Sequence, residues 1–246
     1  MHSSSIYANI QQARANGCKL FAILIDPDKT TDSGLAPLGL QAEKNGVDYF
    51  FLGGSLITED KLDDCLRTIR ENCRIPIILF PGSILQINPN ANGILLLSLL
   101  SGRNPELLIG QHVVAAPYLR ESGLEIIPTA YLLIDGGQPT TAGYMSHTAP
   151  IPADKPDIAA CTAMAGQMLG FKLVYLDAGS GAQDQVSAAT IRAVRKAVDL
   201  PIIVGGGIRT PDAAQQSLEA GADLIVIGNV LEKTPALLED FAQVFE

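Results

Sequence analysis

The sequence has no tryptophan, only 5% aromatic residues and no long apolar run. A membrane-spanning helix needs roughly 18–20 apolar residues, whereas the longest candidate, Ile94–Leu100, is interrupted by Ser98 and closed by Gly102. The first residues, MHSSSIYANIQQARANG, lack the basic start and long apolar core of a secretory signal. We therefore expect a soluble, cytoplasmic protein.

Cysteine and positive charge are also scarce. The four cysteines contain no C-x-x-C pair and are too sparse for a disulfide scaffold or a zinc cluster, so we expect reduced thiols, as is usual in the cytosol. The net charge of −9 argues against a nucleic-acid groove or a polybasic membrane anchor. A small anionic substrate is still compatible, because backbone N–H groups, one cation or a metal suffice to hold it.

Short runs rich in Val, Ile, Leu and aromatic residues recur along the chain, each ended by a small or polar residue. They do not alternate with polar residues, which is typical of strands buried on both faces. The eight runs are Leu20–Asp26, Asp48–Gly54, Pro76–Gly82, Gly93–Leu99, Ile127–Asp135, Leu173–Ser180, Ile202–Gly207 and Leu224–Asn229. Helical patterns precede the first run and separate most of the others, at Ile6–Ala15, Gly34–Asn45, Glu59–Glu71, Asn104–Val113, Ile158–Leu169, Val186–Val198, Pro211–Ala220 and Pro235–Phe245. This alternation predicts a (β/α)8 TIM barrel, with residues 1–246 as a single domain.

Two connections depart from the regular pattern. Ser83–Asn92 (SILQINPNAN) is short and rich in Asn and Pro, whereas a parallel crossover usually needs a dozen or more residues. We expect the third helix to be replaced by a short irregular stretch, which leaves either a slot for a long apolar ligand or a loop covered by neighbouring side chains or a partner subunit. The long Gly136–Asp157 connection is either a lid or surface decoration.

Glycine clusters end the last three predicted strands. They are Ala178–Gly181 (AGSG), Gly205–Gly207 and Gly228–Asn229. Active sites of barrels lie at the carboxyl ends of the strands, and small residues there let backbone N–H groups approach a phosphate. One such cluster is usually only a turn, but three at adjacent strand ends predict a phosphate site.

Oxygen-bearing side chains end the first two strands. Asp26 opens the sequence DPDK, and Ser55 follows the second strand. A carboxylate and a hydroxyl at the barrel mouth suit Mg²⁺, which accepts one or two protein oxygens and completes its shell with water and phosphate. The alternative is that Asp26 is only a turn residue before Pro27.

The sixth strand carries Tyr175 and Asp177, two residues apart and hence on one side of the strand. If that side faces the barrel interior, Asp177 lies beside the predicted phosphate loop. It could then accept a hydrogen bond from a substrate hydroxyl or act as its base. Tyr175 would lie one layer lower, and Tyr131 is placed similarly on the fifth strand, where a structural role is the more usual one. The three histidines have no partners at ligand spacing.

These motifs, in this order, resemble the geranylgeranylglyceryl phosphate synthase family, the PcrB-like prenyltransferases. They are LIDPDK at 24–29, FLGGSLIT at 51–58, IPTAYLLIDGG at 127–137, DKPDIAA at 154–160, YLDAGSGA at 175–182, IIVGGGIRT at 202–210 and IGNVLE at 227–232. The resemblance implies a TIM barrel without a regular third helix. It also implies a transferase of ether-lipid and phospholipid biosynthesis that uses Mg²⁺. Such an enzyme moves a long prenyl group, geranylgeranyl being expected, from its diphosphate to the 3-hydroxyl of sn-glycerol 1-phosphate and releases pyrophosphate.

The resemblance also implies roles for individual residues. Asp26 and Ser55 correspond to the Mg²⁺ ligands, and Asp177 and Tyr175 are the expected catalytic pair. The expected substrate-binding residues are Tyr175, Leu176, Asp177, Ala178, Gly179, Ser180, Gly181, Gly206, Gly207, Gly228 and Asn229. Two positions depart from the family pattern: Asp177 stands where many members have Glu, and Leu24 stands where one branch has a phosphate-binding Lys.

Family members are usually dimers or hexamers, so the resemblance also implies a homo-oligomer, and a lipid product suggests transient membrane contact. Two other readings compete with a prenyltransferase. One is another phosphate-binding barrel enzyme, an isomerase or a cyclase, which would explain the glycine clusters but not the whole ordered set of motifs. The other is a non-catalytic carrier of an anionic metabolite or prenyl lipid, which would show no metal-dependent turnover.

Overall fold

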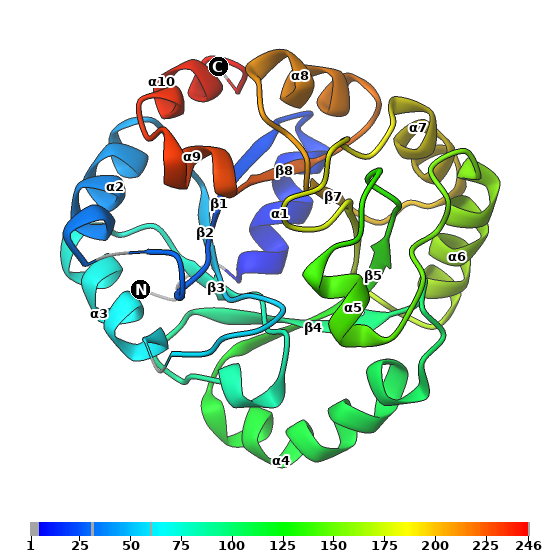
Figure 1. The fold of residues 1–246 in the computed structure, drawn as a ribbon, viewed down its shortest axis with the longest axis horizontal. Coiled ribbons are helices and arrows are strands. Elements are labelled where there is room, and N and C mark those ends of the chain that lie inside the picture. The colour runs from blue at the N-terminus through cyan, green and yellow to red at the C-terminus, as the bar shows by residue number, and fades with distance from the viewer. Residues whose placement is uncertain (1–4, 31, 60, 246) are drawn as a thin grey trace.

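Eight parallel strands close into a barrel in chain order (Figure 1). The computed structural model describes residues 5–30, 32–59 and 61–245. The strands are β1 (Leu20–Ile25), β2 (Tyr49–Leu52), β3 (Ile77–Leu79), β4 (Gly93–Leu99), β5 (Glu125–Leu133), β6 (Leu173–Asp177), β7 (Ile202–Gly205) and β8 (Leu224–Ile227). β1 pairs with β8 as well as with β2, which closes the ring. The predicted TIM barrel is confirmed.

Helices surround the barrel on the outside (Figure 1). The helices of this outer ring are α2 (Asp32–Lys44), α3 (Leu62–Asn72), α4 (Gln111–Ser122), α6 (Pro156–Met168), α7 (Ala188–Ala197), α8 (Pro211–Glu219) and the short α10 (Leu237–Ala242). Two short helices, α5 (Thr141–Ser146) and α9 (Asn229–Lys233), were not predicted. α5 lies within the long Gly136–Asp157 connection, and α9 begins at the residue predicted to end the eighth strand. α4 extends well beyond the predicted end at Val113. Its periodicity is weak because Val113, Val114 and Tyr118 are exposed.

The alternation of side chains along each strand divides the core into two parts. Side chains on one side of each strand fill the barrel interior, where Phe51, Tyr131 and Tyr175 meet. Side chains on the other side, such as Phe50 and Leu176, pack against the surrounding helices. The rings of Tyr131 and Tyr175 lie edge to face, with 5.6 Å between their centroids.

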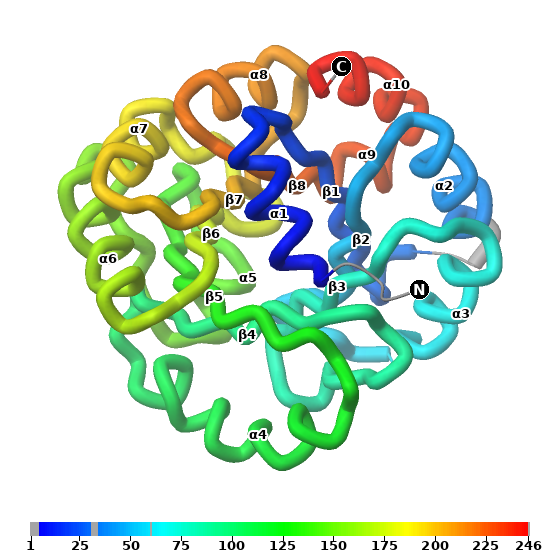
Figure 2. Tube along the Cα trace, turned by 180° about the vertical axis from the view of Figure 1, so that it is seen from behind, coloured from blue at the N-terminus to red at the C-terminus, as the bar shows by residue number. Residues whose placement is uncertain are grey.

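The first helix, α1 (Ile6–Ala15), lies across the amino-terminal end of the barrel (Figure 2). Its residues Ile6 and Ile10 are buried with the interior side chains. The Glu125 carboxylate at the start of β5 accepts the backbone N–H groups of Ile6 and Tyr7, at 2.6 and 2.9 Å. This carboxylate satisfies donors at the positive end of the helix dipole. With this end covered, the carboxyl ends of the strands form the accessible mouth.

The crossover from β3 to β4 contains only a three-residue 3₁₀ turn, η1 (Ile84–Gln86). The prediction that a short irregular stretch replaces the helix after the third strand, between β3 and β4, is confirmed. Along the described ranges, no helix is both long enough and apolar enough to cross a membrane.

Candidate active site

Asp26, one residue beyond β1, lies at the barrel mouth beside the end of β2. Its carboxylate packs against Gly54, where a Cβ atom would be 3.3 Å from Asp26 Oδ1. Ser55 follows directly, so the glycine brings the carboxylate close to the backbone that carries the hydroxyl. Asp26 Oδ2 forms an ion pair with Lys29 Nζ at 2.6 Å, and Asp26 Oδ1 accepts the N–H of Asp28. The turn interpretation of Asp26 is confirmed, because its carboxylate organises the DPDK turn.

The donor chemistry of this corner fits Mg²⁺. Asp26 and Ser55 supply hard oxygen atoms, and Mg²⁺ typically takes only one or two protein carboxylates and keeps water and phosphate oxygens. No group of three or more His, Cys, Asp or Glu residues suited to a metal occurs among the described residues. The corner therefore suits a cation that arrives with a phosphate-bearing substrate, rather than a closed structural metal site.

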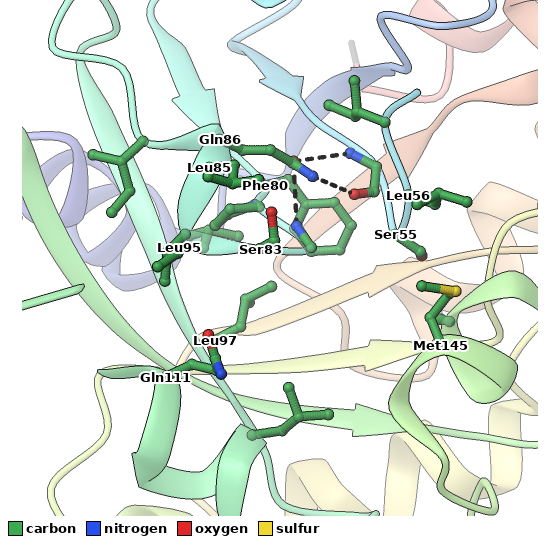
Figure 3. Close-up of a pocket in the computed structure, with 18 of the residues that line it drawn as sticks. Ser55, Leu56, Phe80, Ser83, Leu85, Gln86, Leu95, Leu97, Gln111 and Met145 are labelled. Carbon is green, nitrogen blue, oxygen red and sulfur yellow. Dashed lines mark hydrogen bonds between the residues drawn. The ribbon is translucent and has the colours of Figure 1, made fainter. Parts of the chain in front are cut away.

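Two polar side chains that the sequence did not single out support this corner. Gln86 is 5% exposed, and its amide accepts the N–H groups of Gly54 and Gly82 and donates to the Gly54 carbonyl (Figure 3). Glu232 of α9 accepts the Asp26 N–H at 3.3 Å. Burial raises the pKa of Glu232, while the Asp26 N–H and the Lys29 charge act to lower it. The corner formed by Asp26 and Ser55 is thus positioned from η1 and α9 as well as from its own strands.

Asp177 points into the barrel and is only 7% exposed. Asp177 Oδ2 accepts the hydroxyl of Tyr131 at 2.6 Å, and Oδ1 accepts the Gly179 N–H at 2.7 Å. Burial raises the pKa of Asp177, and these two hydrogen bonds work in the opposite direction. A buried carboxylate whose pKa is raised is a suitable proton acceptor. Tyr131 therefore has a specific partner in the site, which the expectation of a merely structural tyrosine missed.

Tyr175 lies one layer below Asp177, as predicted. It is 1% exposed and stacks on Phe80, with 5.1 Å between ring centroids. The hydroxyl reaches toward β7, where a Cβ on Gly205 would lie 2.5 Å from its oxygen. Burial and the Asp177 charge raise the pKa of Tyr175 well above its usual range. Tyr175 thus supports the floor of the site as a neutral phenol.

The glycine clusters after β6 and β7 meet around Asp177. Gly206 has φ +77°, and a Cβ there would lie 2.6 Å from both Asp177 Oδ1 and Gly179 N. This close approach explains why a glycine is needed between the ends of β6 and β7. Across the mouth, Asn229 Nδ2 donates to Ser180 Oγ at 3.2 Å, which joins the ends of β6 and β8.

Two of the expected binding residues turn their side chains away from the site. Leu176 and Ala178 are 0% and 1% exposed and belong to the core between strands and helices. They can therefore contribute only backbone atoms. The remaining expected residues, Gly179, Ser180, Gly181, Gly206, Gly207, Gly228 and Asn229, lie at the ends of β6, β7 and β8 or directly beyond them.

The long connection after β5 lies over the glycine loops. Gln138 donates to the Gly181 carbonyl. A Cβ on Gly179 would lie 2.7 Å from Thr140 Cγ2, at the start of α5. The position fits the lid interpretation, because the segment covers the predicted phosphate loop.

A cavity of about 680 Å³ runs from Ser55 into the region between β3 and β4 where a regular helix is missing. Ser55 and Leu56 lie at one side, and Leu95 and Leu97 of β4 form part of the wall (Figure 3). The lining is mostly apolar and includes residues from η1, β4, α4 and α5. The crossover was expected to leave either a slot for a long apolar ligand or a loop covered by neighbouring side chains or a partner subunit. The cavity favours the slot.

Comparisons with known proteins agree with this geometry. The family model described as the PcrB family matches residues 11–245. The chain belongs to the PcrB family. It is 52% identical over 242 residues to the geranylgeranylglyceryl phosphate synthase of Chitinophaga pinensis, covering 98% of this chain and 96% of that protein. It is 53% identical over 235 residues to the enzyme of the same name from Spirosoma linguale, covering 96% and 94%.

Solved structures of the same family match the barrel over its full length. The (S)-3-O-geranylgeranylglyceryl phosphate synthase of Thermoplasma acidophilum, solved with its substrate sn-glycerol-1-phosphate, superposes with a TM-score of 0.93 at 35% identity. The match covers 99% of each chain. The closed barrel is thus shared with solved geranylgeranylglyceryl phosphate synthases.

Proposed function

We propose that this protein transfers a long prenyl group, geranylgeranyl being expected, from its diphosphate to the 3-hydroxyl of sn-glycerol 1-phosphate. The observation that carries this proposal is one continuous arrangement at the barrel mouth. An apolar cavity of about 680 Å³ leads to an oxygen-donor corner, and a buried carboxylate lies among glycine loops across the mouth. A prenyl tail, a diphosphate and a glycerol phosphate need these three environments.

The apolar cavity would hold the prenyl tail. Burying a hydrocarbon chain contributes about 0.8 kcal/mol per methylene. The diphosphate end would then lie near Asp26 and Ser55, since Ser55 lines the same cavity. We propose that these two residues hold Mg²⁺, which when bound stabilises the negative charge of the departing diphosphate.

The glycine loops would hold the phosphate of the acceptor through backbone N–H groups. We propose that Asp177 accepts the proton of the 3-hydroxyl while the hydroxyl oxygen of the acceptor forms the ether bond to the prenyl carbon. The bond between that carbon and the diphosphate breaks, and pyrophosphate leaves. Tyr131 and Gly179 hold the carboxylate in place, so the acceptor needs little further activation beyond its position.

The decisive experiment incubates purified protein with sn-glycerol 1-phosphate, Mg²⁺ and prenyl diphosphates of graded length, and follows the organic-extractable product. sn-Glycerol 3-phosphate and EDTA are the controls. A product that needs both the metal and the 1-phosphate supports the proposal. Folded protein that gives no product with any donor would favour an isomerase, a cyclase or a carrier.

A substitution at the metal corner tests the assignment of Asp26. Asp26→Ala should abolish turnover while the protein stays folded, because one of two protein oxygens is lost. Asp199→Asn is the matched control, since Asp199 precedes β7 at the opposite end of the barrel. Unchanged turnover in Asp26→Ala would remove this residue from the metal role.

We also propose that the protein acts in the cytoplasm as a homo-oligomer and contacts membranes transiently to release its product. Several apolar side chains on α4 and the turn before it are exposed and available for such contacts, among them Ile109, Val113 and Tyr118. Light scattering tests the oligomer, and a purely monomeric protein would contradict it. Liposome co-sedimentation with substrates tests the membrane contact, and protein that stays wholly in the supernatant would contradict that.

A further inference from the structure

The wall of the apolar cavity between β4 and α4 begins with a π-helical turn, η2 (Glu106–Gly110). The Gln111 N–H donates to the Glu106 carbonyl, five residues earlier. Such turns are rare and occur frequently at functional sites. Leu107 within the turn and His112 directly after Gln111 both line the cavity.

A buried hydroxyl ties this turn to the barrel. Ser98 of β4 is 3% exposed, and its Oγ donates to the Leu108 carbonyl at 3.2 Å. The same Oγ lies 3.1 Å from His112 Nε2. A hydroxyl has only one proton, so His112 Nε2 carries the proton of the second hydrogen bond and Ser98 Oγ accepts it. β4 is paired with β5 along its whole length, which makes Ser98 a rigid anchor.

The other ring nitrogen of His112 is unusual. Nδ1 is buried and has no hydrogen-bond partner among the described residues. Burial lowers the pKa of His112, with the Leu97 backbone acting in the opposite direction, so the ring next to the cavity is neutral. Leaving a buried acceptor unpaired costs free energy, and an apolar side chain would fill the same space without that cost.

We propose that Ser98 and His112 together set the width of the cavity and thereby select the length of the prenyl donor. The inference rests on the proposed prenyltransferase function. Ser98 holds the π-helical turn at a fixed distance from β4, and the flat imidazole limits the space beside Leu107. Without this contact the wall relaxes, and donors that the native cavity excludes can enter. Ser98 and His112 are thus positioning residues that act on the tail and not on the reacting atoms.

The test compares kcat/KM for prenyl diphosphates of graded length in four variants. Ser98→Ala and His112→Leu remove the contact, whereas Ser98→Thr keeps the hydroxyl and His112→Gln keeps an N–H donor. In the first pair we expect the ratio of kcat/KM between the preferred donor and the next longer one to fall at least about tenfold, because these donors differ by a whole isoprene unit and one methylene alone is discriminated by about tenfold or more. The second pair should keep a ratio near that of the native protein. The KM for sn-glycerol 1-phosphate should stay constant throughout.

Control measurements separate this role from a purely structural one. Glu121→Ala, on the exposed side of α4, should leave the ratio unchanged. Thermal denaturation of each variant shows whether it folds. The test can be made with Ser98→Ala or with His112→Leu alone if only one of the two folds. If the contact-breaking variants lose activity equally with every donor, or keep the native ratio, the inference is overturned. Turnover by the native protein would in that case still support the proposed function. Native protein that is inactive with all donors would refute both.

Discussion

Replacing Tyr131 by Phe should weaken the protein's activity on the acid side of its pH profile and leave the alkaline plateau largely intact. The hydroxyl of Tyr131 donates to Asp177 Oδ2 at 2.6 Å inside the barrel. This bond favours the ionised carboxylate and so lowers the pKa of Asp177, against the larger effect of burial, which raises it. Removing the bond raises that pKa further, and the acid limb of the kcat/KM profile moves to higher pH.

The expected magnitude follows from the strength of the bond. A hydrogen bond to a charged group contributes about 1.5–3 kcal/mol, which corresponds to about 10- to 100-fold in an equilibrium constant. The ionised fraction of Asp177 on the acid limb should fall by that factor, and kcat/KM with it. At high pH the carboxylate ionises in both proteins, so the two profiles should converge.

The assay is the pH dependence of kcat/KM for sn-glycerol 1-phosphate at saturating prenyl diphosphate. Tyr49→Phe is the matched control, because Tyr49 is also a buried tyrosine of the barrel interior. Its profile should overlie that of the native protein. An equal loss of activity for Tyr131→Phe at every pH, with no movement of the acid limb, would refute Asp177 as the proton acceptor.

Three further substitutions test the site and the fold. Gly206→Ala should reduce kcat/KM at least about tenfold, since its Cβ would lie 2.6 Å from Asp177 Oδ1 and misplacement of a catalytic group is costly. Glu125→Gln weakens the cap of α1 and should lower the free energy of unfolding by about 1 kcal/mol, measured by urea denaturation. Arg195→Met leaves the buried Asp223 carboxylate with only Arg14, at 3.7 Å, as a charged partner in place of the 2.9 Å contact, and should destabilise the protein by up to about 3 kcal/mol.

Each of these three results has a clear opposite. Native kinetics in Gly206→Ala would mean that the glycine is not needed for the site. Unchanged unfolding of Glu125→Gln would show that α1 is held by its apolar residues alone. For Arg195→Met, the double variant with Asp223→Asn should recover part of the lost stability. No recovery would show that the loss does not come from the buried Asp223 charge.

Much of the architecture was predictable because it depends on local patterns. Apolar runs without alternation predict strands covered on both faces, and their regular separation by helical segments predicts a barrel. β4 was predicted with its exact ends, Gly93–Leu99, because turn-forming residues flank it on both sides. The short crossover at Ser83–Asn92 is equally local, since ten residues cannot hold a full helix and both loops.

Partnerships between distant residues could not be predicted in the same way. Tyr131 and Asp177 are 46 positions apart and meet only because β5 and β6 pair in one particular register. His112 shows no metal-ligand spacing in the sequence, yet η2 and β4 bring it to Ser98. The Glu125 cap of α1 likewise joins groups about 120 positions apart.

The sequence by itself determined the order of strands and helices, the missing third helix and the glycines at the barrel mouth, because each follows from short-range periodicity or from a residue's own backbone freedom. Only the tertiary structure decided which carboxylate meets which hydroxyl, and that Leu176 and Ala178 face away from the site. The physical reason is that barrel closure and strand register choose the side each residue faces, and a shift of one residue would reverse that choice.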